Sequence, residues 1–97
     1  MVDYNFPSPQ RIILVMEIVG FVAGVLTLFT YVPQSIKTIK TRKTRDLSLS
    51  TLVLLSVSAM LWVVYGLHKS LVAVWLTNSV VAVLGIIILS IKIKNTE

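Results

Sequence analysis

The chain lacks cysteine, which excludes disulfide bonds, thiolate nucleophiles and thiolate metal sites. Charged side chains are scarce as well, at 13% of the residues, against about 25% in a typical soluble domain. One histidine and four carboxylates leave little material for a metal site or for general acid–base catalysis. We therefore expect neither an enzyme nor a protein that carries a metal or another cofactor.

Apolar residues are abundant instead. They make up 56% of the 97 residues, and the mean hydropathy is +0.89. The length allows one domain. The net charge of +5 is not typical of a nucleic-acid-binding domain here, because the apolar runs leave no solvated basic surface. We expect a single transmembrane domain over residues 1–97 that contacts membrane lipid and no nucleic acid.

Three runs without Asp, Glu, Lys or Arg, at 18–36, 49–67 and 71–91, interrupt the polar segments. A helix needs about 20 apolar residues to cross a hydrocarbon core of roughly 30 Å. In lipid the backbone must pair its own polar groups, so spanning segments of this kind are helical. The predicted fold is all-α, with helices at about 12–38, 48–67 and 71–93. A polar tail at 1–10 precedes them, and its two prolines, Pro7 and Pro9, predict irregular structure.

Basic residues are distributed unevenly between the two ends of these spans. The first loop and the C-terminus carry most of them: Lys37, Lys40, Arg42, Lys43, Arg45, Lys92 and Lys94. Only Arg11 and Lys69 lie at the opposite ends. The positive-inside rule then places the N-terminus outside and the C-terminus in the cytoplasm. We interpret the basic loop as an anchor for topology and lipid headgroups, in preference to a ligand site.

The first span contains a helix breaker and a pair of small residues. Pro33 removes one backbone hydrogen bond and clashes with the carbonyl of Phe29, so we expect a kink there. The kink is either static or a hinge, and proline alone favours a static one. Gln34 follows and can bond freed backbone or a neighbouring helix. Gly20 and Gly24 form a small-xxx-small pair that allows another helix to approach closely.

An aromatic face and one amide distinguish the other two spans. Ser58, Trp62 and Tyr65 lie at i, i+4 and i+7, on one face of the second helix. Trp62 is either a packing residue between helices or a platform on which a sugar ring stacks. Asn78 is the only amide deep in the third span, and leaving it unpaired in hydrocarbon costs about 2–7 kcal/mol. It either bonds to another helix or binds a ligand.

Small residues accompany Asn78 on its face of the third helix. Trp75, Ala82 and Gly85 share roughly that face, so we expect an open space there, lined by an aromatic and by small side chains.

The order of four motifs carries a resemblance. They are Tyr-Val-Pro-Gln at 31–34, Thr-Arg-Asp-Leu-Ser at 44–48, Leu-Trp-Val-Val-Tyr-Gly at 61–66, and Asn78. Over about residues 17–92 the chain resembles the PQ-loop membrane proteins, and more closely the bacterial SemiSWEET sugar transporters. The resemblance implies a parallel homodimer of three-helix protomers that forms a six-helix transporter in the bacterial inner membrane. It also implies facilitated diffusion (uniport) of mono- or disaccharides by alternating access.

The resemblance assigns roles to particular residues. It implies that Trp62 and Asn78 contact the sugar, and that Pro33, before Gln34, is a hinge for the inner gate.

The resemblance also extends to the two gates. It matches Tyr65 and Lys69 to the outer gate, although Leu71 occupies the position where the family has an acid. With less support it matches Tyr31 and Thr51 to the inner gate.

Physical reasoning also favours a dimer, because three helices alone enclose no path wide enough for a sugar. Two alternatives remain. The first is a PQ-loop amino-acid transporter, which the sequence disfavours because no carboxylate between Glu17 and the cytoplasmic loop is available for proton coupling. The second is a small membrane subunit that packs against a larger complex and transports nothing.

Overall fold

The computed structural model describes residues 8–95, which fold into three α-helices and no strand. The helices are α1 (Pro9–Thr41), α2 (Leu49–His68) and α3 (Val72–Lys94). Each is long and apolar enough to cross a membrane. The protein is therefore an all-α, multi-pass membrane protein, as expected. Both ends of α2 and of α3 lie one residue later than the predicted bounds. Residues 1–7 of the predicted tail lie outside the described part of the chain.

The prediction of irregular structure through residue 10 is wrong for its last two residues. Helix α1 begins at Pro9, and Ser8 is its N-cap, with its hydroxyl accepting a hydrogen bond from the backbone N–H of Arg11 at 3.3 Å. Serine at this position satisfies an otherwise unpaired N–H group. Proline is favoured at the first helical position because the N–H it lacks would have had no partner there. Pro9 therefore starts the helix instead of preventing it.

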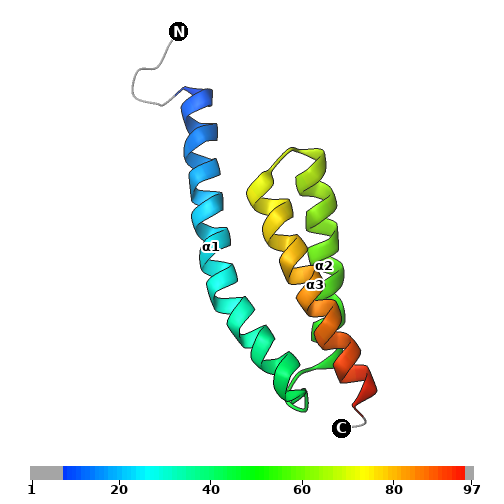
Figure 1. Cartoon of the computed structure of the whole chain (residues 1–97). Helices are drawn as coiled ribbons and strands as arrows, with labels where there is room; N and C mark the ends of the chain where they lie inside the picture. Colours follow the sequence, from blue (N-terminus) through cyan, green and yellow to red (C-terminus); the bar gives the residue numbers. More distant parts are fainter. Residues whose placement is uncertain (1–7, 96–97) are drawn as a thin grey trace.

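Helix α1 is longer than the other two and is bent. Its 33 residues correspond to a length of about 50 Å, and its N-terminal end extends past the α2–α3 turn (Figure 1). Pro33 lies inside the helix, and the C-terminal half of α1 curves towards the end of α3 (Figure 1). The bend agrees with the kink expected from a proline inside a helix.

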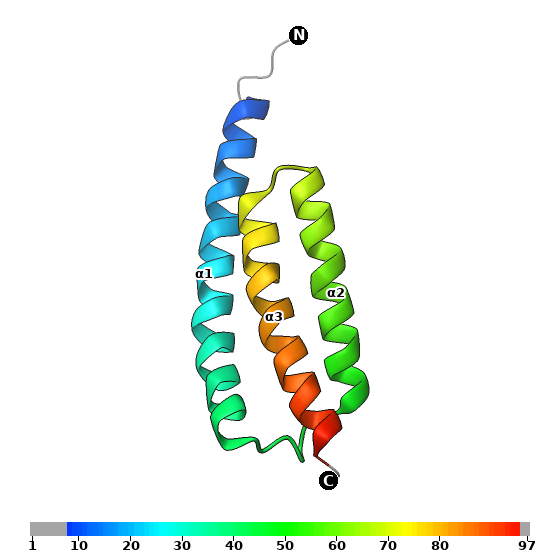
Figure 2. The same cartoon turned by 45° about the vertical axis from the view of Figure 1, so that its right-hand side comes forward.

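Helix α3 lies between α1 and α2, which do not pack against each other (Figure 2). Glycines allow the close approaches on both sides of α3. A Cβ at Gly24 of α1 would lie 2.5 Å from Thr77 Oγ1, and one at Gly66 of α2 would lie 2.8 Å from the backbone nitrogen of Trp75. The small pair of α1 therefore serves packing within the protomer.

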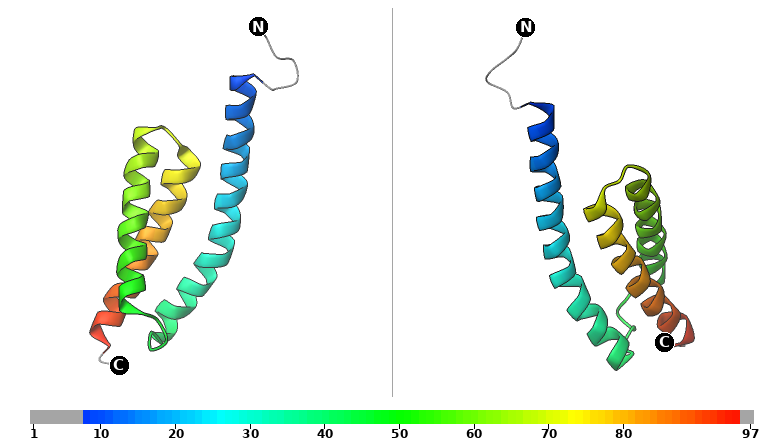
Figure 3. Two further views of the ribbon diagram at one scale, coloured as in Figure 1. Left: turned by 180° about the vertical axis from the view of Figure 1, so that it is seen from behind. Right: turned by 45° about the horizontal axis from the view of Figure 1, so that its top comes forward.

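The protomer buries little of its apolar surface. Its central cluster consists of Ala59 from α2 with Val81 and Ala82 from α3, and Tyr31 of α1 packs against it. In the most hydrophobic 18-residue stretch of α1 only 6% of the residues are buried, and in the corresponding stretches of α2 and α3 22% are buried. The views in Figure 3 show α1 diverging from the α2–α3 pair towards its N-terminal end. Lipid or another protein must cover the remaining apolar surface.

Candidate functional site

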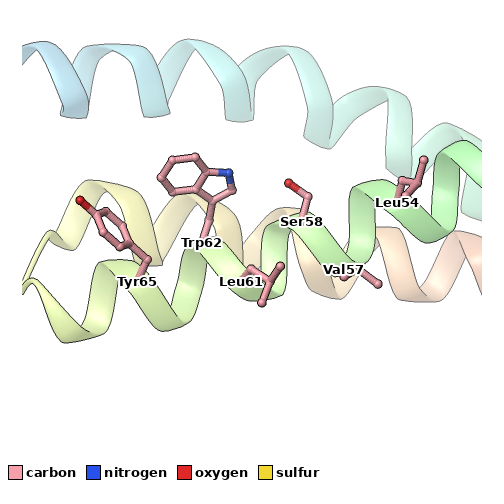
Figure 4. A pocket seen from close by; sticks show the side chains of 6 residues that line it. All are labelled: Leu54, Val57, Ser58, Leu61, Trp62 and Tyr65. Carbon is pink, nitrogen blue, oxygen red and sulfur yellow. The ribbon is translucent and has the colours of Figure 1, made fainter.

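One face of α2 forms an open, mostly apolar hollow of about 580 Å³. Its lining residues are Leu54, Val57, Ser58, Leu61, Trp62 and Tyr65. They come together because helical spacing repeats every three to four residues. Trp62 and Ser58 point to the same side of α2 (Figure 4). The predicted alignment of Ser58, Trp62 and Tyr65 on one face is therefore present in the structure.

Trp62 presents its indole to the hollow and is not packed inside the protomer. Half of the side chain, 50%, is exposed. Tyr65 meets the indole edge-on, with ring centroids 5.6 Å apart and an interplanar angle of 86°. Such T-shaped pairs are stabilising, so Tyr65 supports the orientation of Trp62. Trp62 is therefore not a core residue of the protomer, and its exposed half is available to a stacking partner; the choice between packing and stacking on a sugar stays a prediction.

Asn78 is partly buried on α3, and its amide nitrogen donates a hydrogen bond to the carbonyl oxygen of Val74, one turn earlier, at 2.9 Å. Within residues 8–95 it forms no hydrogen bond to another helix. The amide retains its carbonyl oxygen and one N–H hydrogen for a further partner. Asn78 does not line the hollow that contains Trp62, so one protomer does not bring these two predicted site residues together.

The open space expected beside Asn78 is not found around Ala82 and Gly85 in the described protomer. Ala82 is buried in the central cluster, with 7% of its surface exposed. Gly85 is buried too, and a Cβ there would lie 3.0 Å from Ser56 Oγ and 3.6 Å from the Tyr31 hydroxyl. These small residues let side chains of α1 and α2 approach α3, so they serve packing.

The two residues matched to the inner gate occupy different environments. Tyr31 of α1 is partly buried against the central cluster. Thr51 is exposed in the first turn of α2, where its backbone N–H donates to the hydroxyl of Ser48 at 3.4 Å. Within one protomer, Tyr31 is thus half-buried and Thr51 is a surface residue.

A second hollow follows a polar face of α1 that the sequence analysis did not identify as a site. It has a volume of about 420 Å³ and is lined by Leu26, Thr27, Thr30, Tyr31 and Gln34. The hydroxyls of Thr27 and Thr30 bond to carbonyls of their own helix at 2.9 Å. The spacing of these polar residues at i, i+3 and i+7 is the pattern that could have indicated this face.

Pro33 and Gln34 are both exposed, and they face different sides of α1. Pro33 lines an apolar hollow of about 430 Å³ together with Phe29 and Val32. Gln34 lines the hollow beside Thr27 and Thr30 instead. Its amide makes no hydrogen bond to described residues, so it does not serve the freed backbone or a neighbouring helix here.

The residues matched to the outer gate lie at the end of α2. Tyr65 reaches the hollow, whereas Lys69 is exposed and ends the helix as its C-cap. No ion pair forms anywhere within residues 8–95. Leu71 is the N-cap of α3 and provides no side-chain cap. Glu17 of α1 lines a recess of about 140 Å³ with Ser70 and Leu71, and is therefore the acid that faces this turn.

Comparisons with known proteins agree with the arrangement of these helices and motifs. Residues 15–75 match the PQ-loop family, described as the PQ loop repeat. The chain is 34% identical over 79 residues to the protein of Bradyrhizobium diazoefficiens named sugar transporter SemiSWEET, a match that covers 81% of this chain and 92% of that protein. Proteins of the same name from Leptospira biflexa and Escherichia coli are 33% and 36% identical over 79% and 78% of this chain, and over 91% and 85% of their own lengths.

Solved structures show the same fold. A crystal structure of SemiSWEET in the inward-open conformation superposes with a TM-score of 0.77 at 33% identity, covering 84% of this chain and 87% of that one. A crystal structure of a bacterial homologue of SWEET transporters gives a TM-score of 0.70 at 30% identity, covering 82% and 96%. Sequence and fold together show that this chain belongs to the PQ-loop family and, within it, to the SemiSWEETs.

Proposed function

We propose that the protein is a sugar transporter that moves mono- or disaccharides across the membrane by alternating access, as uniport-type facilitated diffusion. The observation that carries the proposal is the match of four-fifths of the chain to nearly the full length of a protein named as a sugar transporter. The relatives are named as transporters and not as enzymes. The hollow around Trp62 on a membrane-spanning helix supplies a surface of suitable chemistry.

Trp62 and Ser58 are the residues of this hollow that suit a sugar. A pyranose ring has apolar C–H faces, which stack on an exposed indole, and a rim of hydroxyls. The Ser58 hydroxyl lies beside the indole (Figure 4) and offers both a donor and an acceptor. The free carbonyl oxygen of Asn78 offers another acceptor. The lining carries no charge, as suits a neutral substrate.

The transporting unit in this proposal is a parallel homodimer. Helices α1 and α2 do not pack together, and the hollows on each of them are open to one side. A second protomer about a two-fold axis along the membrane normal would close them into one path. Every axial residue would then occur twice, so two Trp62 rings could sandwich one sugar ring. Asn78, absent from the hollow of one protomer, would contribute from the assembled cavity.

The proposed cycle assigns the remaining residues to a hinge and two gates. Pro33, before Gln34, allows α1 to bend, because its ring leaves the Phe29 carbonyl without its helical partner. Tyr31 and Thr51 belong to the inner gate, and Tyr65 and Lys69 to the outer gate.

We place the protein in the bacterial inner membrane, with the N-terminus outside and the C-terminus in the cytoplasm. The cations of the α1–α2 loop and of the end of α3 support this orientation. They also provide contacts for anionic lipid headgroups.

Uptake by the purified protein in liposomes tests the proposal. We expect counterflow of radiolabelled glucose or sucrose, and its loss in Trp62→Ala. Val64→Ala is the matched control, because Val64 is exposed on the same helix but does not line the hollow. Each variant must remain dimeric in detergent. Wild-type liposomes that take up none of a panel of mono- and disaccharides would contradict the proposal.

The same experiment separates the two alternatives. Uptake of amino acids without sugars would identify an amino-acid transporter. Purification only together with another chain, without uptake, would identify a non-transporting subunit.

A further inference from the structure

The loop between α1 and α2 contains a completely buried side chain. Thr44 has 0% of its surface exposed, although its neighbours Lys43 and Arg45 are exposed. A polar loop at the end of a helical bundle usually remains solvated. The burial of Thr44 therefore requires that another part of the chain covers it.

The last turn of α3 and its C-cap provide that cover through four hydrogen bonds. Lys92 Nζ donates to the carbonyl oxygens of Thr44 at 2.9 Å and Arg45 at 3.5 Å. Asn95 Nδ2 donates to Thr44 Oγ1 at 2.8 Å and to the carbonyl oxygen of Arg42 at 2.9 Å. We call these contacts the α3 clasp.

Lys92 uses its charge on backbone oxygens and not on a carboxylate, since no ion pair forms within residues 8–95. Hydrogen bonds from a charged donor are stronger than neutral ones. Lys94, two residues later, is exposed and takes no part in the clasp. The two lysines therefore have the same chemistry and differ in their contacts with the loop.

The clasp joins α3 to the end of the segment that follows the bend in α1. Arg42 is the C-cap of α1, with φ 55° and its N–H bonded to the Thr38 carbonyl at 2.8 Å. Since α1 and α2 do not pack together, α1 is held to the protomer by α3 and by this loop. A change in the bend at Pro33 moves the part of α1 that the clasp fastens to α3.

We infer that the α3 clasp makes the segment of α1 after Pro33 and the C-terminal end of α3 move as one body during gating. Lys92 and Asn95 are then positioning residues for the inner gate, and they do not contact the sugar. The inference rests on the proposed transport function. According to this inference, bending at Pro33 moves the C-terminal end of α3 only while the hydrogen bonds of the α3 clasp are formed.

Distances between spin labels on the two clasped ends test this inference. Labels at Lys40→Cys and Ile93→Cys suit the purpose, because both positions are exposed and the chain has no other cysteine. Labelled protomers diluted with unlabelled ones report the distance within one protomer. We expect one narrow distribution in the otherwise unsubstituted protein, unchanged by saturating sugar.

Substitution of Lys92 separates the role of the clasp from simple folding. Lys92→Met keeps the aliphatic stem, and we expect a broad distance distribution and transport slower by about tenfold. Asn95→Ala, which removes the other two hydrogen bonds, should broaden the distribution as well. Lys92→Arg, which retains a charged donor, and Lys94→Met should leave both measurements as in the wild type. All variants are compared as dimers in detergent and as reconstituted protein.

Several results would overturn the inference. A narrow distribution in Lys92→Met would show that the clasp is not needed to hold the two ends together. A broad distribution with wild-type transport would show that gating does not use the clasp. A second distance that appears on adding sugar to the wild type would show that the clasp opens. If the wild type moves no sugar, the proposed function fails, and the distances alone decide whether the ends form one body.

Discussion

Neighbouring residues of α3 allow the role of the Asn78 amide to be isolated at the scale of a single residue. Asn78 and Ser79 each donate to a carbonyl one turn earlier, at 2.9 Å and 2.6 Å. The serine hydroxyl has one donor, which this bond uses, whereas the amide retains a donor and a carbonyl acceptor. Asn78 therefore retains both a donor and an acceptor for a sugar hydroxyl, whereas Ser79 retains only acceptor lone pairs.

Asn78→Ala should reduce sugar transport by a factor of about 10² or more. Each missing partner costs roughly 1–3 kcal/mol, the dimer repeats the loss, and about 1.4 kcal/mol corresponds to a tenfold change. Initial rates of counterflow over a range of sugar concentrations measure the effect. Ser79→Ala is the control and should transport normally. Equal rates for the two variants would remove Asn78 from the sugar site.

At the scale of elements, the helices differ in how closely they approach one another. A Cβ at Gly66 would meet the backbone of Trp75 at 2.8 Å, whereas a Cβ at Gly20 would meet only the Ala73 side chain at 3.5 Å. The first distance is a clash with atoms that cannot rotate away. The second is ordinary van der Waals contact. Helix α2 therefore approaches α3 more closely at Gly66 than α1 approaches α3 at Gly20.

Gly66→Ala should destabilise the protein by about 1–3 kcal/mol, as overpacking of a close contact does. Gly20→Ala should be neutral or stabilising, because alanine is the better helix former by about 1 kcal/mol. Thermal unfolding in detergent, followed by circular dichroism, compares the two. A normal unfolding midpoint for Gly66→Ala would mean that α2 and α3 separate at this point without cost.

Pro33 determines the bend of α1, which is a property of the whole helix. Pro33→Ala restores a backbone N–H that can bond to the Phe29 carbonyl. We expect a straighter helix and a variant that folds and dimerises but transports several-fold more slowly, because one gating state becomes too stable. Counterflow at equal protein density measures this. Transport at the wild-type rate would identify the bend as static.

At the scale of the whole molecule, the exposed hollows determine where a second protomer can pack. Leu61 lines the α2 hollow and is 65% exposed, whereas Ala82 of α3 is 7% exposed. A residue that faces the axis of a dimer must be exposed in the protomer. Leu61 meets this condition and Ala82 does not.

Leu61→Cys should form a crosslink between protomers in native membranes, whereas Ala82→Cys should not. The absence of native cysteine removes any background. Electrophoresis without reductant after mild oxidation detects the product. The parallel arrangement also requires that labels at both C-termini react from the same side of the membrane. Labelling from opposite sides would exclude a parallel dimer.

The sequence by itself determined the class of fold and the membrane location of the helices. Long apolar runs in lipid permit little other than helices, so the three spans were predictable to within a residue or a few. The proline bend and the shared face of Ser58, Trp62 and Tyr65 also follow from local rules, since they depend on neighbours along one helix. The start of α1 at Pro9 does not follow from proline as a helix breaker, because proline is favoured at the first helical position after a capping residue such as Ser8.

Only the tertiary structure decided which residues of the predicted site lie together. Helical spacing indicates which side chains share a face but not which face meets which helix. Placing α3 between α1 and α2 buried Ala82 and Gly85 and left Trp62 exposed. The same packing brought Lys92 to the carbonyl oxygen of Thr44. Contacts between residues so distant along the chain depend on the order of the helices in space, which no local pattern encodes.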